Sequence, residues 1–282
     1  MEKKIIILIG LVVILFAVNY SFLDSLIVGF FDEGEVVVVE RVIDGDTFVV
    51  GTTGMTSEKG GLNTSVRLLG INSPEKGEQY YEEAKEFLEE AVINKNVRLG
   101  FGKEKKDKYD RILAYVFVGG ENINLKLVEE GFANFYFPSG RDIYYEDFKK
   151  AWEECSNNLC EMSENKCIVL KEFDYEEEVV VFYNKCGDCD LTGWEIKDEG
   201  RKSFVFPDFV LGGGEIVKVI VSAPPSKDDS GEPQAYPEES SDKILTKGNE
   251  LVWERNDYVW TDSGDTLFLR DGEGKLVLWE SY

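Results

Sequence analysis

The chain contains 282 residues, which is long enough for two ordinary domains, and 43% of them are hydrophobic. It carries a formal net charge of −24 and no histidine. This composition excludes histidine general bases, Ser-His-Asp triads and histidine-ligated zinc, so hydrolytic chemistry must use carboxylates, arginines and an oxygen-binding cation.

The negative charge is distributed unevenly along the chain. Residues 35–150 have a net charge of −5, whereas residues 151–282 have a net charge of −17. Proteins that bind nucleic acid usually present a basic face, because neutralising phosphates releases counterions. The acidic half is therefore a poor surface for nucleic acid and better suited to a protein or surface partner. A saline habitat is an alternative origin of the acidity.

Residues 1–24 form a predicted transmembrane anchor or signal peptide. Lys3 and Lys4 precede an apolar run over residues 5–23, close to the ~20 residues that a membrane-spanning helix needs. The positive-inside rule predicts a cytoplasmic N-terminus and an extracellular location for everything that follows. A cleaved signal peptide, which would leave the protein secreted, is the alternative. We favour the anchor because no small-residue cleavage pattern follows Val18.

Residues 35–155 are expected to form the first folded domain. Runs rich in β-branched residues predict strands at residues 36–39, 48–50, 66–69, 97–101 and 112–118. Helical patterns are expected at residues 79–92, 124–130 and 144–154, with Gly131 ending the second of them. The Gly-, Thr- and Ser-rich residues 51–65 predict a long hairpin loop. These elements indicate an α+β, OB-like barrel with packed helices.

Three short blocks in this domain contain the residue types that phosphodiester hydrolysis requires. They are Val42–Thr47 (VIDGDT), Val66–Glu75 (VRLLGINSPE) and Asp107–Arg111 (DKYDR). A phosphodiester is anionic, so its charge must be neutralised before water can attack. Two guanidinium groups can grip the phosphate, a divalent cation can position water, and a carboxylate can act as the base.

The blocks supply each of these groups. Asp46 is the candidate metal ligand, Arg67 and Arg111 are the candidate phosphate ligands, and Glu75 is the candidate base. Purely structural roles are the alternatives: Asp46 belongs to an ordinary turn, Arg67 pairs with Glu75, and Arg111 is merely solvated.

In order and internal spacing, the three blocks resemble the signature blocks of the staphylococcal nucleases, or thermonucleases. The segments Leu113-Ala-Tyr115 and Glu129–Ala133 extend this resemblance. It implies that Asp46, Asn72 and the Ser73 carbonyl bind Ca²⁺, with Asp44 supporting them from outside the ligand set. It also implies that Glu75 orders the attacking water while Arg67 and Arg111 clamp the phosphate.

Asn72 departs from the family pattern, because a second aspartate usually stands at this position. An amide oxygen still binds calcium, but one formal charge is lost. We therefore expect weaker calcium binding, or a preference for Mg²⁺ or Mn²⁺. A degenerate nuclease fold that binds nucleic acid without cutting it is the alternative.

Five cysteines gather in a short stretch that includes a predicted linker at residues 156–166. They are Cys155, Cys160, Cys167, Cys186 and Cys189. The clustering predicts local disulfides in an oxidising compartment, with one thiol left over. A zinc site that includes the Cys186-Gly-Asp-Cys189 pair, or unpaired thiols, are the alternatives. The sequence does not specify the pairing.

Residues 167–282 are expected to form an all-β domain. Strands are predicted at residues 168–170, 179–183, 202–206, 216–221, 250–253 and 266–269, and residues 222–241 read as an exposed loop. The segments Val181–Asn184, Leu191–Ile196 and Val259–Asp271 resemble the lamin-tail domain. The resemblance implies an Ig-like sandwich with Trp194 and Trp260 in its core, serving as a scaffolding, adhesive or substrate-presenting module.

Together these features predict a membrane-anchored, calcium-dependent nuclease that hydrolyses DNA, RNA or both at the cell surface. The alternatives are a non-catalytic nucleic-acid-binding protein and a structural protein of the cell envelope. The sequence does not distinguish DNA from RNA, or endonuclease from exonuclease action.

Overall fold

The computed structural model describes residues 35–51, 64–222 and 244–282. The predicted anchor at residues 5–23, most of the loop at 51–65 and nearly all of the loop at 222–241 lie outside these ranges. Among the residues that are described, no helix combines the length and the hydropathy needed to cross a membrane.

The first domain is a closed barrel with helices packed against it, which agrees with the predicted OB-like class. Its strands follow the order β3-β2-β1-β5-β6-β7, and a parallel pairing of β3 with β6 closes the barrel. The strands are β1 (Glu35–Asp44), β2 (Thr47–Val50), β3 (Thr64–Leu68), β5 (Asn96–Gly100), β6 (Ile112–Val118) and β7 (Glu121–Asn122).

The helices cover the barrel through their apolar faces. Helix α3 (Tyr81–Val92) buries Ala84, Leu88 and Val92, which recur every four residues and therefore share one face. The Asn122 side chain accepts a hydrogen bond from the Leu125 amide and caps the next helix. The remaining helical elements are α4 (Ile123–Glu129), α5 (Tyr145–Glu154) and the 3₁₀ turn η1 (Asn158–Cys160).

Two very short strands position part of the candidate site. Strand β4 (Ile71–Asn72) pairs with β8 (Asn134–Phe135), and the register places Asn72 opposite Asn134. Phe135 is fully buried in the core of the first domain. The β4–β8 pair therefore attaches the second sequence block to the hydrophobic core while keeping two amide side chains next to each other.

The second domain is all β, as predicted. A five-stranded sheet, β16-β17-β15-β10-β9, and a four-stranded sheet, β13-β12-β18-β19, enclose a common core that contains Trp194 and Trp260. The strands are β9 (Ile168–Asp174), β10 (Val179–Asn184), β11 (Cys189–Asp190), β12 (Glu195–Lys197), β13 (Ser203–Val205), β14 (Val210–Leu211), β15 (Ile216–Ser222), β16 (Ile244–Lys247), β17 (Glu250–Glu254), β18 (Thr266–Arg270) and β19 (Leu276–Ser281).

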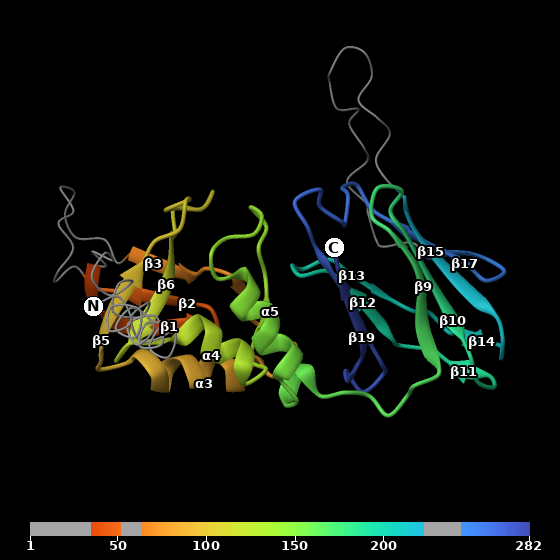
Figure 1. Cartoon of the computed structure of the whole chain (residues 1–282), viewed down its shortest axis with the longest axis horizontal. Helices are drawn as coiled ribbons and strands as arrows, with labels where there is room; N and C mark the ends of the chain where they lie inside the picture. The colour runs from red at the N-terminus through yellow and green to blue at the C-terminus, as the bar shows by residue number, and fades with distance from the viewer. Residues whose placement is uncertain (1–34, 52–63, 223–243) are drawn as a thin grey trace, which may run out of the picture.

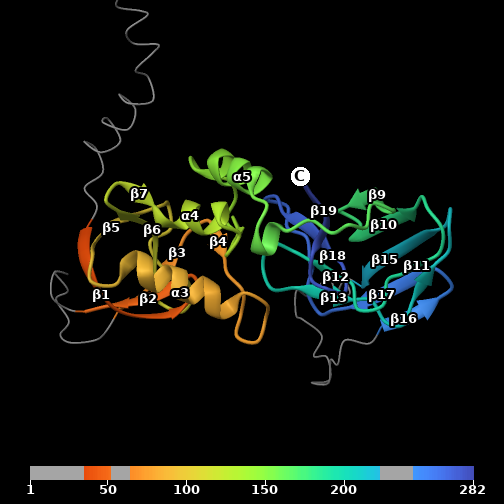
Figure 2. The same ribbon diagram turned by 90° about the horizontal axis from the view of Figure 1, so that it is seen from below.

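The two domains share an apolar junction. The core of the first domain extends to Phe268 and Leu276, which belong to β18 and β19. The ring centroid of Phe268 lies 5.3 Å from that of Trp152 on α5 and 6.2 Å from that of Phe135. Figures 1 and 2 show α5 on the side of the barrel that faces this sheet. The candidate site lies beside this junction.

Disulfides flank the connection between the domains. Cys155 is bonded to Cys160 and Cys167 to Cys186, whereas Cys189 is a free thiol. The structure thus supplies the pairing that the sequence left open. Because Cys186 takes part in a disulfide, it cannot form the zinc-binding pair with Cys189.

Candidate functional site

The carboxylate of Asp46 is held in the turn between β1 and β2. Its Oδ2 atom lies 3.0 Å from Nη2 of Arg67 and accepts a 3.0 Å hydrogen bond from the Ser73 amide. The Thr47 hydroxyl donates to its Oδ1 at 2.9 Å. A Cβ at Gly45 would lie 2.7 Å from Cβ of Ala84, so glycine is required beside Asp46. The sequence block thus places a buried, fixed carboxylate next to an arginine.

Arg67 is held in place by backbone carbonyls. Its Nη1 donates to the carbonyls of Leu68 and Ile71 at 2.6 and 2.9 Å, and its Nη2 donates to Oδ1 of Asn72 at 3.3 Å. Its ion-pair partner is Asp46. The structural alternative, a pair between Arg67 and Glu75, is therefore not formed. The guanidinium group joins the first two sequence blocks.

Asp44 supports the turn that carries Asp46. Its Oδ1 atom accepts a 3.2 Å hydrogen bond from the Asp46 amide. Burial, together with repulsion from the Asp46 carboxylate, raises the pKa of Asp44 to about 6. Two closely spaced carboxyls thus compete for ionisation in this turn, and a bound cation would relieve the competition.

Asn72 contacts the second domain. Its side chain is 4% exposed, and its Nδ2 donates to the carbonyl of Gly200 at 2.9 Å. The neighbouring Asn134 donates in the same way to the carbonyl of Glu199, also at 2.9 Å. A carboxylate has no hydrogen to donate, so aspartate at position 72 would face the carbonyl without a bond. The amide therefore has a structural role that the sequence blocks alone did not indicate.

Glu75 is more exposed than Asp46, Arg67 and Arg111, and it also contacts the second domain. Its carboxylate forms an ion pair with Arg201, and 42% of the Glu75 side chain and 64% of the Arg201 side chain are exposed. Sequence reasoning missed Arg201, because no motif links it to the nuclease blocks. A pair this exposed contributes little to stability and can exchange partners.

Arg111 is oriented by its own sequence block. Its Nε donates to Oδ2 of Asp107 at 2.6 Å, and its backbone amide donates to Oδ1 of the same carboxylate at 3.0 Å. Partial burial opposes ionisation of Asp107, but these hydrogen bonds outweigh it and lower the pKa of that carboxyl. Arg111 is thus held by a carboxylate, rather than merely solvated in a charged loop.

A cavity of about 850 Å³ brings part of the site together. Arg67, Asn72 and Arg111 line it from the first domain, and residues 198–202 line it from the second. Asp46 adjoins it through its ion pair with Arg67. Glu75 is not among the lining residues, but its partner Arg201 is. The three sequence blocks therefore converge, with the carboxylate of Glu75 at the margin.

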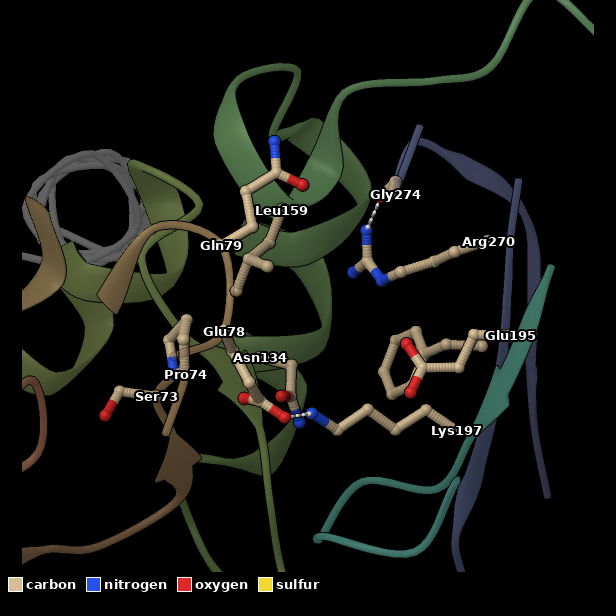
Figure 3. A pocket seen from close by; sticks show the side chains of 11 residues that line it. Ser73, Pro74, Glu78, Gln79, Asn134, Leu159, Glu195, Lys197, Arg270 and Gly274 are labelled. Carbon is tan, nitrogen blue, oxygen red and sulfur yellow. Dashed lines mark hydrogen bonds and ion pairs between the residues drawn. The ribbon is translucent and has the colours of Figure 1, made fainter. Parts of the chain in front are cut away.

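A smaller cavity of about 210 Å³ lies beside Ser73. Figure 3 shows Ser73 and Glu78 of the first domain on one side and Lys197 and Arg270 of the second domain on the other. Nζ of Lys197 and Oε1 of Glu78 form an ion pair across it at 3.0 Å. Burial lowers the pKa of Arg270 to about 10, and its Nη1 donates to the Gly274 carbonyl. Polar contacts between the domains thus continue past the site.

The oxygen atoms of the site suit a hard cation. Asp46 offers a carboxylate, Asn72 an amide oxygen and Ser73 a backbone carbonyl, which are ligands that calcium accepts. Within the described parts of the chain, no group of three or more His, Cys, Asp or Glu residues is gathered as a metal site. Of the three proposed ligands only Asp46 is charged, so a metal bound by them would take its remaining ligands from water or substrate oxygens.

Family models match both domains. A model described as "Staphylococcal nuclease homologue" matches residues 65–160, and one described as "Lamin Tail Domain" matches residues 161–282. The first match includes the blocks that contain Arg67 and Arg111. The block that contains Asp46 precedes it.

Several curated proteins are similar to this chain. It is 39% identical over 117 residues to a thermonuclease of Staphylococcus intermedius, covering 39% of this chain and 66% of that protein. It is 37% identical over 124 residues to a thermonuclease of Staphylococcus hyicus, covering 41% of this chain and 68% of that protein. It is 37% identical over 107 residues to an uncharacterized endonuclease of Haemophilus influenzae, covering 38% of this chain and 56% of that protein. These names are consistent with a phosphodiesterase hydrolase.

Proposed function

Because the chain belongs to the staphylococcal nuclease family, we propose that it is a calcium-dependent nuclease that hydrolyses DNA, RNA or both at the cell surface. The observation that carries the proposal is the convergence of Arg67, Asn72 and Arg111 on one cavity, with Asp46 bonded to Arg67. The cell-surface location rests on the apolar segment at residues 5–23.

In the proposed reaction, the two arginines bind the substrate phosphate. Arg67 and Arg111 donate hydrogen bonds to its oxygens, and these bonds strengthen as negative charge develops in the transition state. Asp46, Asn72 and the Ser73 carbonyl would hold the cation, which neutralises charge and positions water. Glu75 accepts the proton of the attacking water, for which it must leave Arg201.

A binding protein without catalytic activity is the second candidate. The ion pair of Glu75 with Arg201 and the hydrogen bond from Arg67 to Oδ1 of Asn72 favour it, because both occupy groups that catalysis needs. The two candidates differ in whether metal-dependent cleavage occurs and whether it requires Glu75.

Digestion of plasmid DNA and of RNA tests the proposal. We expect cleavage with Ca²⁺, Mg²⁺ or Mn²⁺ that stops with chelator, and a loss of roughly 10²- to 10⁴-fold in Glu75→Gln, because the amide cannot accept the proton. Glu90→Gln, an exposed change on α3, is the matched control and should retain activity. Retention of nucleic-acid binding without cleavage in the unmodified protein would instead support the second candidate.

Asn72→Asp is expected to lower the calcium concentration needed for activity, because it adds a charge to the ligand set. The same change removes the hydrogen bond to the Gly200 carbonyl, so the free energy of unfolding should fall by about 1–3 kcal/mol. A calcium titration of activity and urea denaturation measure the two effects.

Asn134→Asp is the matched control for this prediction. It removes the parallel hydrogen bond to the Glu199 carbonyl without touching the proposed ligands. It should therefore lower stability and leave the calcium requirement unchanged. An unchanged calcium requirement in Asn72→Asp would count against Asn72 as a ligand.

A further inference from the structure

A segment of the second domain forms one side of the candidate nuclease site. This segment, the 198–202 loop (Asp198–Lys202), connects β12 to β13. Its backbone carbonyls at Glu199 and Gly200 accept the hydrogen bonds from Asn134 and Asn72. The loop thus lies against the residues that the site uses.

The buried carboxylate of Glu199 also anchors the loop to the first domain. Glu199 is 5% exposed, and its Oε2 accepts a 3.0 Å hydrogen bond from the Phe137 amide. Its Oε1 accepts a 2.6 Å hydrogen bond from the Thr266 hydroxyl of its own domain. Buried hydrogen bonds to both domains therefore fix the loop, and its exposed side chain at Arg201 extends from a defined position.

The cavity beneath the loop is locally basic, although the chain is acidic. Eight Lys or Arg residues and six Asp or Glu residues line it, in a chain with a net charge of −24. Arg201 and Lys202 belong to the strongly acidic half of the sequence. Lys202 is already bonded to the Tyr258 carbonyl and paired with Asp257. Arg201 is therefore the better placed of the two to meet a ligand.

Arg201 can exchange its partner when substrate enters. Its pair with Glu75 is largely solvent-exposed and therefore weak, whereas a phosphate accepts bidentate hydrogen bonds from a guanidinium. Moving Arg201 from Glu75 to a phosphate would also release the carboxylate that the proposed reaction needs as its base. Substrate binding and activation of Glu75 would then be one event.

We propose that the 198–202 loop is part of the substrate site and that Arg201 binds a substrate phosphate. This inference rests on the proposed nuclease function. It assigns a part in substrate binding to a domain whose overall charge is unfavourable for nucleic acid.

The test uses the full-length protein with a labelled oligonucleotide. We expect Arg201→Ala to raise the KM for this substrate roughly tenfold, with a smaller change in kcat. The dependence of log affinity on log salt should lose about one unit of slope, as expected for one lost phosphate contact. Arg201→Lys keeps the charge and should recover part of the affinity.

Arg255→Ala is the matched control, because Arg255 belongs to the same domain and pairs with Asp257 outside this cavity. It should change neither KM nor the salt slope. An unchanged KM and an unchanged salt slope in Arg201→Ala would overturn the role of Arg201 as a phosphate ligand. An increase in activity in Arg201→Ala would show that the loop blocks the site, and would overturn the role of Arg201.

Failure of the underlying nuclease function gives a different result. In that case no metal would support cleavage by the unmodified protein. Fluorescence anisotropy with the same oligonucleotide would still measure whether Arg201→Ala weakens binding. No effect of Arg201→Ala there would overturn the inference about the loop independently of catalysis.

Discussion

Replacement of Arg111 by alanine is expected to lower kcat for phosphodiester cleavage by roughly 100- to 1,000-fold, the usual loss when one preorganised transition-state donor is removed. Asp107 holds the guanidinium at 2.6 Å, so the group is positioned before substrate arrives. The stabilisation is greatest in the transition state, because charge on the phosphate oxygens is then largest. Steady-state kinetics on a labelled oligonucleotide measure the loss.

Two further variants define what this loss means. Arg111→Lys retains the charge but not the planar fork, so most of the loss should remain. Lys108→Ala removes another cation from the same cavity and should have little effect on kcat. If Arg111→Ala stayed within about tenfold of the unmodified protein, Arg111 would not be a transition-state ligand.

The stability of the folded chain is expected to fall as the pH rises from about 4 to about 8. Three buried carboxyls, Asp198, Glu199 and Asp265, are responsible. Burial and mutual repulsion raise the pKa of each to about 7. Arg141 and Lys202 also face this group and favour the ionised forms, but they do not outweigh the burial.

The sign follows from proton linkage. Between the ordinary pKa of these carboxyls and about 7, the folded chain binds more protons than the unfolded chain, so stability decreases with increasing pH and levels off above that window. Because the pKa of each carboxyl lies well above its ordinary value in the folded chain, the total loss should reach several kcal/mol. Urea denaturation followed by tryptophan fluorescence at several pH values measures it.

Glu199→Gln should flatten this pH dependence and raise stability at pH 8. The amide can still bond the Phe137 amide through its oxygen and the Thr266 hydroxyl through its nitrogen. Glu280→Gln, at an exposed position on β19, should leave the slope unchanged. Stability that stays constant or increases between pH 5 and pH 8 would contradict the assignment of buried protons to these carboxyls.

Much of the fold was predictable because the local patterns and the final structure agree. The β-branched run at 112–118 forms β6 with the predicted bounds, and the apolar spacing at 144–154 forms α5 to within one residue. Trp194 and Trp260 are buried in the second core, as expected. The two-residue strands β4, β7, β8, β11 and β14 were not predicted, since two residues cannot establish a periodic pattern.

The candidate site was predictable within each sequence block but not between the domains. Asp46 and Arg67 meet because a hairpin and its neighbouring strand place them together, and their roles as ligands remain predictions. No local pattern indicates that Gly200 and Arg201 reach the site, because domain docking depends on shape and charge across two complete surfaces. The amide at Asn72 was the one available signal, as it replaced an expected carboxylate and bonds the Gly200 carbonyl.

The paired amides of Asn72 and Asn134 have a consequence for any attempt to isolate the nuclease portion. Both side chains are buried, and both donate to carbonyls that the other domain supplies. After excision of residues 161–282, these amide groups would donate to water instead. Phe135 and Trp152 would lose their packing against Phe268 and become exposed. A truncated fragment would therefore report on a rearranged surface, and its kinetics would not describe the intact enzyme.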